Sequence, residues 1–149
     1  METIYHERQR GGYCRLHALN NLIGKQVYDP KQFDKLCDEY DSINKFSKGT
    51  SKQQLFYNNG GNNNIFGYVL EKLGYSYTMH HYDFYRNKTV NVCENTIGYI
   101  LYSKEHAFCI RKHDDKFYLI DSMKPKPVIV NPAQFCNKKM LGVIHLRGT

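Results

Sequence analysis

Four residues of the sequence could together perform acyl transfer: Gln9, Cys14, His106 and Asp121. A cysteine nucleophile needs a neighbouring base, and the base needs an acceptor that orients its ring. A side-chain amide near the nucleophile can donate to the oxyanion of a tetrahedral intermediate, a contribution of about 3 kcal/mol. A glutamine, cysteine, histidine and aspartate in this order therefore predict a cysteine peptidase, provided that the fold brings them together.

Cys14 begins a segment in which Leu16, Leu19 and Ile23 follow helical spacing. A glycine pair precedes it, and Gly24 can end the helix in a left-handed conformation. A helix N-terminus carries partial positive charge, which favours the thiolate form of a cysteine. Many buried cysteines lie near helix starts, so local context alone favours a packing role for Cys14.

His106 precedes a predicted strand at 107–112, and Asp121 ends a predicted strand at 116–121. A hairpin with its turn at 113–115 would bring the two residues side by side, and the carboxylate could then fix the imidazole tautomer. A register shift of one residue would separate them. The alternative is a strand-end pair that serves solubility alone.

Gln9 lies shortly before Cys14, across a glycine-containing turn, and is the predicted oxyanion donor together with the Cys14 backbone amide. His17 is a second histidine near the thiol. It shares a helix face with Cys14, but its rigid helical offset makes the approach to the thiol awkward. We expect His17 to be a partly buried structural residue with satisfied hydrogen bonds.

The rest of the pattern places helices first and an antiparallel sheet second, which is an α+β arrangement. Helices are expected at 14–23, from Pro30 after an Asp29 cap to about Tyr40, and at 65–73. The segment Ser42–Asn64 is expected to be a loop, either functional or plain surface. Strands are expected at 75–82, 97–102, 107–112, 116–121, 128–130 and 141–146, with a helical turn at 131–135.

The chain has 149 residues, with 41% hydrophobic and 23% charged residues, and is expected to form a single soluble domain, 1–149. It holds no apolar run of about 20 residues and does not begin like a signal peptide. We therefore expect a cytoplasmic or nuclear protein.

Five cysteines, without a Cys-x-x-Cys pair, argue against both a disulfide framework and a zinc site. Apart from Cys14, we expect them to be packing residues: Cys37, Cys93, Cys109 and Cys136. The pair His80-His81 alternates between the faces of a strand, so a shared metal site is not expected there. The net charge of +7 comes from scattered lysines without a dense basic run, so nucleic acid is not an expected partner.

The sequence resembles the Josephin family of deubiquitinating cysteine peptidases at three places, 6–22, 104–108 and 118–122. The first carries Glu-x-Gln, Cys, His and Asn-Asn at spacings similar to those of the family. The resemblance implies a papain-like fold with N-terminal helices packed on an antiparallel sheet. It also implies a substrate, the bond after the C-terminal glycine of ubiquitin, and no metal or organic cofactor. We expect a monomer that acts on polyubiquitin chains and ubiquitinated proteins.

The resemblance assigns the nucleophile to Cys14, the general base to His106, the orienting acid to Asp121 and the oxyanion donor to Gln9. The chain departs from the family at Ala107, where a bulky aromatic residue is usual, and between the second and third helices. Two alternatives stay open. One is a peptidase for another ubiquitin-like modifier, and the other is a non-catalytic module that binds ubiquitin or an acidic partner.

Overall fold

The computed structural model describes residues 4–8, 13–47, 61–81, 92–102, 106–132 and 142–148, with backbone alone at 61–64, 80 and 81. Within these ranges the chain forms three helices, α1 (Cys14–Ile23), α2 (Pro30–Ile43) and α3 (Gly61–Lys72). The strands are β1 (Ser76–His81), β2 (Thr96–Tyr102), β3 (Ala107–His113), β4 (Lys116–Ile120), β5 (Val128–Val130) and β6 (Gly142–Arg147).

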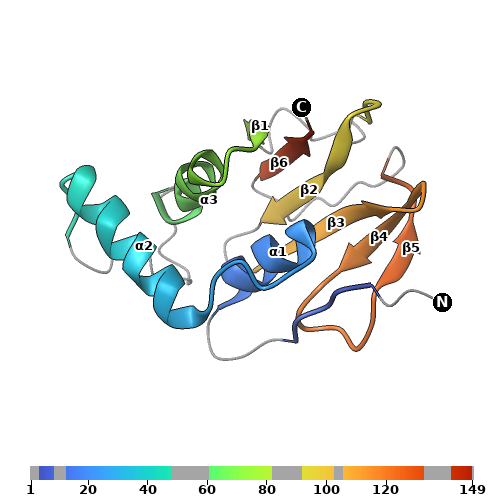
Figure 1. The fold of residues 1–149 in the computed structure, drawn as a ribbon, viewed down its shortest axis with the longest axis horizontal. Coiled ribbons are helices and arrows are strands. Elements are labelled where there is room, and N and C mark those ends of the chain that lie inside the picture. Colours follow the sequence, from blue (N-terminus) through green and yellow to red (C-terminus); the bar gives the residue numbers. More distant parts are fainter. Residues whose placement is uncertain are drawn as a thin grey trace.

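The strands form one six-stranded sheet in the order β1-β6-β2-β3-β4-β5, and every neighbouring pair is antiparallel. Helix α1 packs on β2, β3 and β4, while α3 packs against β1 and α2 (Figure 1). The predicted α+β class, with helices packed on an antiparallel sheet, is therefore confirmed. Each predicted strand is present, and its described bounds differ from the prediction by no more than one residue.

Side chains alternate between the two faces of the sheet, as the period of a strand requires. The face under α1 contributes to the main core, where Leu19 and Leu22 of the helix meet Ile100, Cys109 and other fully buried strand residues. The opposite face holds a second cluster built on Tyr99, Leu101, Phe108, Ile110 and Val143. Packing against the sheet thus anchors α1, the helix that begins at Cys14.

Helix α2 begins as its sequence predicts. The Asp29 carboxylate accepts the Gln32 backbone N–H at 2.8 Å, and the Gln32 side chain accepts the Asp29 backbone N–H at 2.9 Å. This reciprocal capping box satisfies backbone donors that a helix start leaves unpaired. Pro30 occupies the first turn, where its missing N–H costs nothing.

The predicted loop Ser42–Asn64 is wrong at both ends. Helix α2 continues through Ile43, and the backbone is already helical from Gly61, four residues before the predicted start of α3 at Ile65. The polar composition of these stretches misled the prediction. Tyr40 and Asp41 are buried and hold the last turn of α2 in place. Ile65 and Phe66 are buried and anchor α3, whose first turn is rich in asparagine. Residues 48–60 lie outside the described ranges.

The hairpin between β3 and β4 turns at Asp114 and Asp115, whose φ angles are 50° and 64°. Two successive residues with positive φ form the tight turn that matches strand twist. His113 pairs with Lys116 and so belongs to β3, not to the turn in which the prediction placed it. The predicted helical turn at 131–135 stays a prediction, because residues 133–135 lie outside the described ranges. Among the described residues, no helix is long and apolar enough to cross a membrane.

Candidate active site

Cys14 is the first residue of α1 and is buried, with 5% of the residue exposed. No acidic residue lies in the first turn of α1, and the Tyr13 side chain does not cap the helix. The Tyr13 hydroxyl instead donates to Asp34 of α2 at 2.8 Å, which ties the helix start to its neighbour. The positive end of the α1 dipole therefore lies at Cys14, with no acidic side chain of the first turn to offset it.

His106 lies immediately before β3, and Asp121 immediately after β4. Their side chains meet, with His106 Nε2 2.6 Å from Asp121 Oδ1. The register that pairs Cys109 with Ile120 brings the two strand ends together. The predicted juxtaposition of His106 and Asp121 is thus found in the structure.

The Cys14 side chain hydrogen-bonds to the His106 imidazole. Because Nε2 faces Asp121, Nδ1 is the ring nitrogen left to meet the thiol. The Phe108 ring stacks on the His106 ring, with the two ring centroids 6.2 Å apart. The fold therefore brings together three of the four residues singled out from the sequence, although they come from a helix and two strand ends.

The charges around His106 favour its protonated form. Burial alone lowers the pKa of His106, but the hydrogen bond to Asp121 and the contact with Cys14 outweigh it and raise the pKa to about 9. At neutral pH the ring is then an imidazolium beside the sulfur. Such a pair can supply both a thiolate nucleophile and a proton donor for a leaving group.

Asp121 is held in its charged form by several donors. Burial raises the pKa of the carboxyl, but hydrogen bonds from His106 and from the Met123 backbone N–H hold it below the ordinary value. The Met123 bond measures 2.9 Å and reaches Oδ1, the same oxygen that faces His106. The backbone of the turn after β4 thereby fixes the carboxylate that orients the ring.

Gln9, the predicted oxyanion donor, lies in 9–12, outside the described residues, and its role stays a prediction. The segment 4–8 just before it is described, and it carries contacts that we did not predict. Glu7 receives hydrogen bonds from His17 and Asn20 of α1, and the His6 ring meets the Asp121 backbone carbonyl. The sequence shows a carboxylate at Glu7 and possible donors at His17 and Asn20 of the next helix. Residue type alone, however, does not show that these side chains meet.

The prediction for His17 is confirmed. Its side chain is buried, with 4% of the residue exposed, and Nδ1 lies 2.8 Å from Glu7 Oε1. The Glu7 carboxylate therefore holds the ring, and His17 ties the N-terminal segment to α1.

The other cysteines divide into two groups. Cys37 and Cys109 are fully buried, as predicted for packing residues, and burial raises the pKa of the Cys109 thiol. Cys93 is exposed, so its predicted packing role is wrong: it lies in a turn before β2. Cys136 and the side chains of His80 and His81 lie outside the described part of the chain. In that part, no three His, Cys, Asp or Glu side chains gather as a metal site would require.

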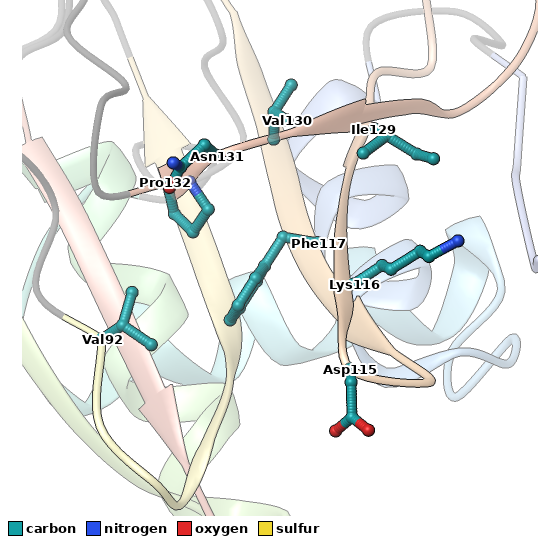
Figure 2. Close-up of a pocket in the computed structure, with 8 residues that line it drawn as sticks. All are labelled: Val92, Asp115, Lys116, Phe117, Ile129, Val130, Asn131 and Pro132. Atoms are coloured by element: carbon teal, nitrogen blue, oxygen red, sulfur yellow. The ribbon is translucent and has the colours of Figure 1, made fainter.

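A hollow of about 430 Å³ lies at the other end of the β3–β4 hairpin. Figure 2 shows the Phe117 ring extending from β4 toward Val92 and Pro132, with Asp115 at the hairpin turn. The five residues of β4 span roughly 16 Å and separate this hollow from Asp121. Cys14, His106 and Asp121 are not among the residues that line it.

Comparison with known proteins gives a family match over most of the chain. The Josephin family model matches residues 9–144. Over 145 residues the chain is 23% identical to ataxin-3 from Rattus norvegicus and from Homo sapiens. Each of these two alignments covers 88% of this chain. A shorter match of 35 residues, 24% of this chain, is 46% identical to Josephin-2 from Homo sapiens. These matches span 41% of rat ataxin-3, 40% of human ataxin-3 and 19% of human Josephin-2.

Proposed function

Since this chain belongs to the Josephin family, we propose that it is a cysteine peptidase that hydrolyses the bond after the C-terminal glycine of ubiquitin. The observation that carries the proposal is the contact of Cys14 with His106, whose ring is held by Asp121. Family membership supports a ubiquitin-directed thiol hydrolase, and this contact supplies the arrangement that such chemistry needs.

In the proposed first half-reaction, the Cys14 thiolate attacks the carbonyl carbon of the terminal glycine of ubiquitin. The carbonyl electrons move to oxygen, and the Cys14 amide and Gln9 donate to the resulting oxyanion. His106 then gives its proton to the leaving amine, usually the side chain of a lysine, as the carbon–nitrogen bond breaks. The products are a free amine and a thioester between Cys14 and ubiquitin.

In the second half-reaction, neutral His106 takes a proton from water, and the water oxygen attacks the thioester. Cys14 leaves as a thiolate beside the newly formed imidazolium, and ubiquitin leaves with a free carboxylate. Asp121 stabilises the imidazolium in both halves and keeps the ring in the tautomer that the reaction requires. The glycine pair at the tail of ubiquitin suits a nearly buried nucleophile, because no side chain obstructs its approach to Cys14.

The test uses ubiquitin that carries an electrophile in place of its terminal carboxylate. The wild-type chain should form a covalent adduct, and Cys14→Ala should form none. Cys93→Ala is the matched control, because Cys93 is an exposed thiol elsewhere on the protein and its loss should leave the adduct unchanged. Cleavage of a lysine-linked ubiquitin dimer should follow the same pattern.

Probes built on other ubiquitin-like modifiers separate the choice of substrate from the chemistry. Reaction with the probe of another modifier, and not with that of ubiquitin, would support the peptidase activity but contradict ubiquitin as the substrate. If the folded chain reacts with none of these probes, the catalytic proposal is wrong. Binding of ubiquitin without reaction would then favour a non-catalytic module.

A further inference from the structure

The N-terminal segment 4–8 connects the two parts of the candidate active site. Figure 1 shows this segment, in dark blue, running beside α1 and the loop that follows β4. Ile4 packs against the main core, and Tyr5, His6 and Glu7 are all partly buried. The segment belongs to neither a helix nor a strand, so side chains hold it in place.

Glu7 is bound to α1 through both its side chain and its backbone. Its carboxylate Oε1 lies 2.8 Å from His17 Nδ1 and accepts the Asn20 side-chain amide at 3.1 Å, and Tyr5 donates to the other oxygen. The Glu7 backbone N–H donates to Asn21 Oδ1 at 2.6 Å. Burial raises the pKa of Glu7, but its hydrogen bonds outweigh burial and keep the pKa below the ordinary value.

The adjacent residue, His6, is bound to Asp121, the residue that orients the general base. Its Nε2 lies 2.9 Å from the Asp121 backbone carbonyl, which can only accept, so Nε2 is the donor. The Asp121 side chain in turn meets His106. Two adjacent residues of one segment therefore link the helix that begins at Cys14 to the strand end that holds His106.

The apolar core already holds α1 against the sheet, but such contacts are not directional and permit small displacements. Hydrogen bonds to Glu7 and His6 restrict both distance and angle. A misplacement of about 1 Å near reacting groups can cost on the order of a hundredfold in rate. The segment 4–8 is thus suited to keep Cys14 precisely aligned with His106.

We propose that the adjacent residues His6 and Glu7 are positioning residues, which hold the His106–Asp121 pair against Cys14 by binding Asp121 on one side and α1 on the other. Gln9 follows Glu7 by two residues and can lie at most about 7 Å from it along the chain, so the same contacts limit where Gln9 can reach. The inference deepens the proposed function and rests on it for the turnover measurement alone.

The experiment compares Glu7→Gln and His6→Ala with the wild-type chain. Glu71→Gln is the matched control, because Glu71 is exposed on α3 and also accepts a tyrosine hydroxyl, that of Tyr77, at 3.0 Å. Alkylation of Cys14 by iodoacetamide at pH 7 is followed by mass spectrometry of the Cys14 peptide. Turnover is measured on ubiquitin with a fluorogenic amide at its C-terminus.

We expect Glu7→Gln and His6→Ala to lower the Cys14 alkylation rate severalfold and kcat on the order of tenfold, with KM within about twofold. Glu71→Gln should stay within about twofold of wild type in all three. His6→Gln retains an N–H donor and should recover most of the activity that His6→Ala loses. If His6 and Glu7 only stabilised the fold, their substitution would lower the melting temperature. His6→Gln would then not recover activity, and kcat would not fall separately from a change in KM.

Unchanged alkylation of Cys14 in folded Glu7→Gln and His6→Ala overturns the proposal, whatever happens to turnover. If Glu7→Gln does not fold, His6→Ala decides the result, because it leaves every contact of Glu7 in place. A wild-type chain that does not turn over ubiquitin would defeat the proposed function. The alkylation rates would still test the positioning role.

Discussion

His106 Nε2 lies 2.6 Å from Asp121 Oδ1, and that same oxygen accepts the Met123 backbone N–H at 2.9 Å. The carboxylate therefore has one donor from the backbone of its own turn and one from the ring that it orients. Because the backbone donor is part of the turn after β4, it fixes the direction from which Asp121 meets His106. The ring is left with one nitrogen to face Cys14, as acyl transfer by a thiolate requires.

Asp121→Asn should lower the upper pH limit of activity. The substitution keeps the shape of the acceptor but removes the Asp121 charge, which together with Cys14 outweighs burial and raises the pKa of His106 to about 9. We expect kcat/KM of the wild-type chain to fall as the pH rises through about 9, since the imidazolium must protonate the leaving amine. In the variant the fall should come at lower pH, with a loss on the order of tenfold at pH 7. An identical alkaline limb in the two pH profiles would contradict this reading.

The contribution of His106 to stability should be lost between about pH 6.5 and pH 9. The folded chain binds this proton more tightly than the unfolded chain, because the pKa of His106 rises from 6.5 to about 9 on folding. Its contribution is therefore complete below 6.5 and disappears as the pH rises through 9. Because about a fifth of the His106 side chain is exposed and solvent screens its charge, we expect this contribution to the unfolding free energy to be roughly 2 kcal/mol.

The measurement is the difference in unfolding free energy between the wild-type chain and His106→Gln, by urea denaturation at several pH values. Other groups also titrate in this range. Burial raises the pKa of Cys109, for example, which favours unfolding at alkaline pH, but this effect is common to both proteins and cancels in the difference. A difference that grows with pH would show that the sign is wrong.

Gly98→Ala should be far more destabilising than Gly74→Ala. A Cβ on Gly98 would lie 2.2 Å from the Ile110 carbonyl oxygen of β3 and 2.5 Å from a methyl of Leu22, so strand β2 or β3 would have to shift and the Leu22 side chain to rearrange. A Cβ on Gly74 meets nothing within 4 Å, and its cost comes only from a φ of 82°. We expect about 3 kcal/mol for the first and about 1 kcal/mol for the second, measured by urea denaturation. Equal losses would mean that the close contacts of Gly98 with the Ile110 carbonyl and the Leu22 side chain are not maintained in solution.

Asp29→Ala should lower stability without affecting the thiol chemistry. The change removes the capping bond to the Gln32 backbone, which costs about 1 kcal/mol. Asp29 lies at the start of α2 and contacts none of the three groups at the site. Thermal unfolding should report the loss, while the alkylation rate of Cys14 stays within about twofold of wild type. A large fall in alkylation would show that α2 positions Cys14, by way of the Tyr13–Asp34 contact.

Local signals were enough to predict the start of each element that carries the site. Helix α1 begins at Cys14 and ends in a left-handed Gly24, with a φ of 92°, as the apolar spacing and the glycine indicated. The β3–β4 hairpin follows from two runs of strand-forming residues around adjacent aspartates. Once that register holds, the meeting of His106 with Asp121 is a geometric consequence, and this explains why it was predictable without a structure.

Predictions that depended on composition were less successful. Polar residues around Ser42 and asparagines before Ile65 suggested a loop, but helix ends packed against neighbours override weak local preference. Cys93 looked like a packing residue by its type, yet it is exposed, because burial depends on what the rest of the chain brings against a turn.

By itself, the sequence determined the order of the elements and the residue types available for chemistry at Cys14, His106 and Asp121. Only the tertiary structure decided that His6 and Glu7 link those residues. The physical reason is that periodicity and capping act over a few neighbouring residues, so they can be read along the chain. A hydrogen bond from His6 to a carbonyl 115 positions away depends on the packing of the whole core, which no local pattern encodes.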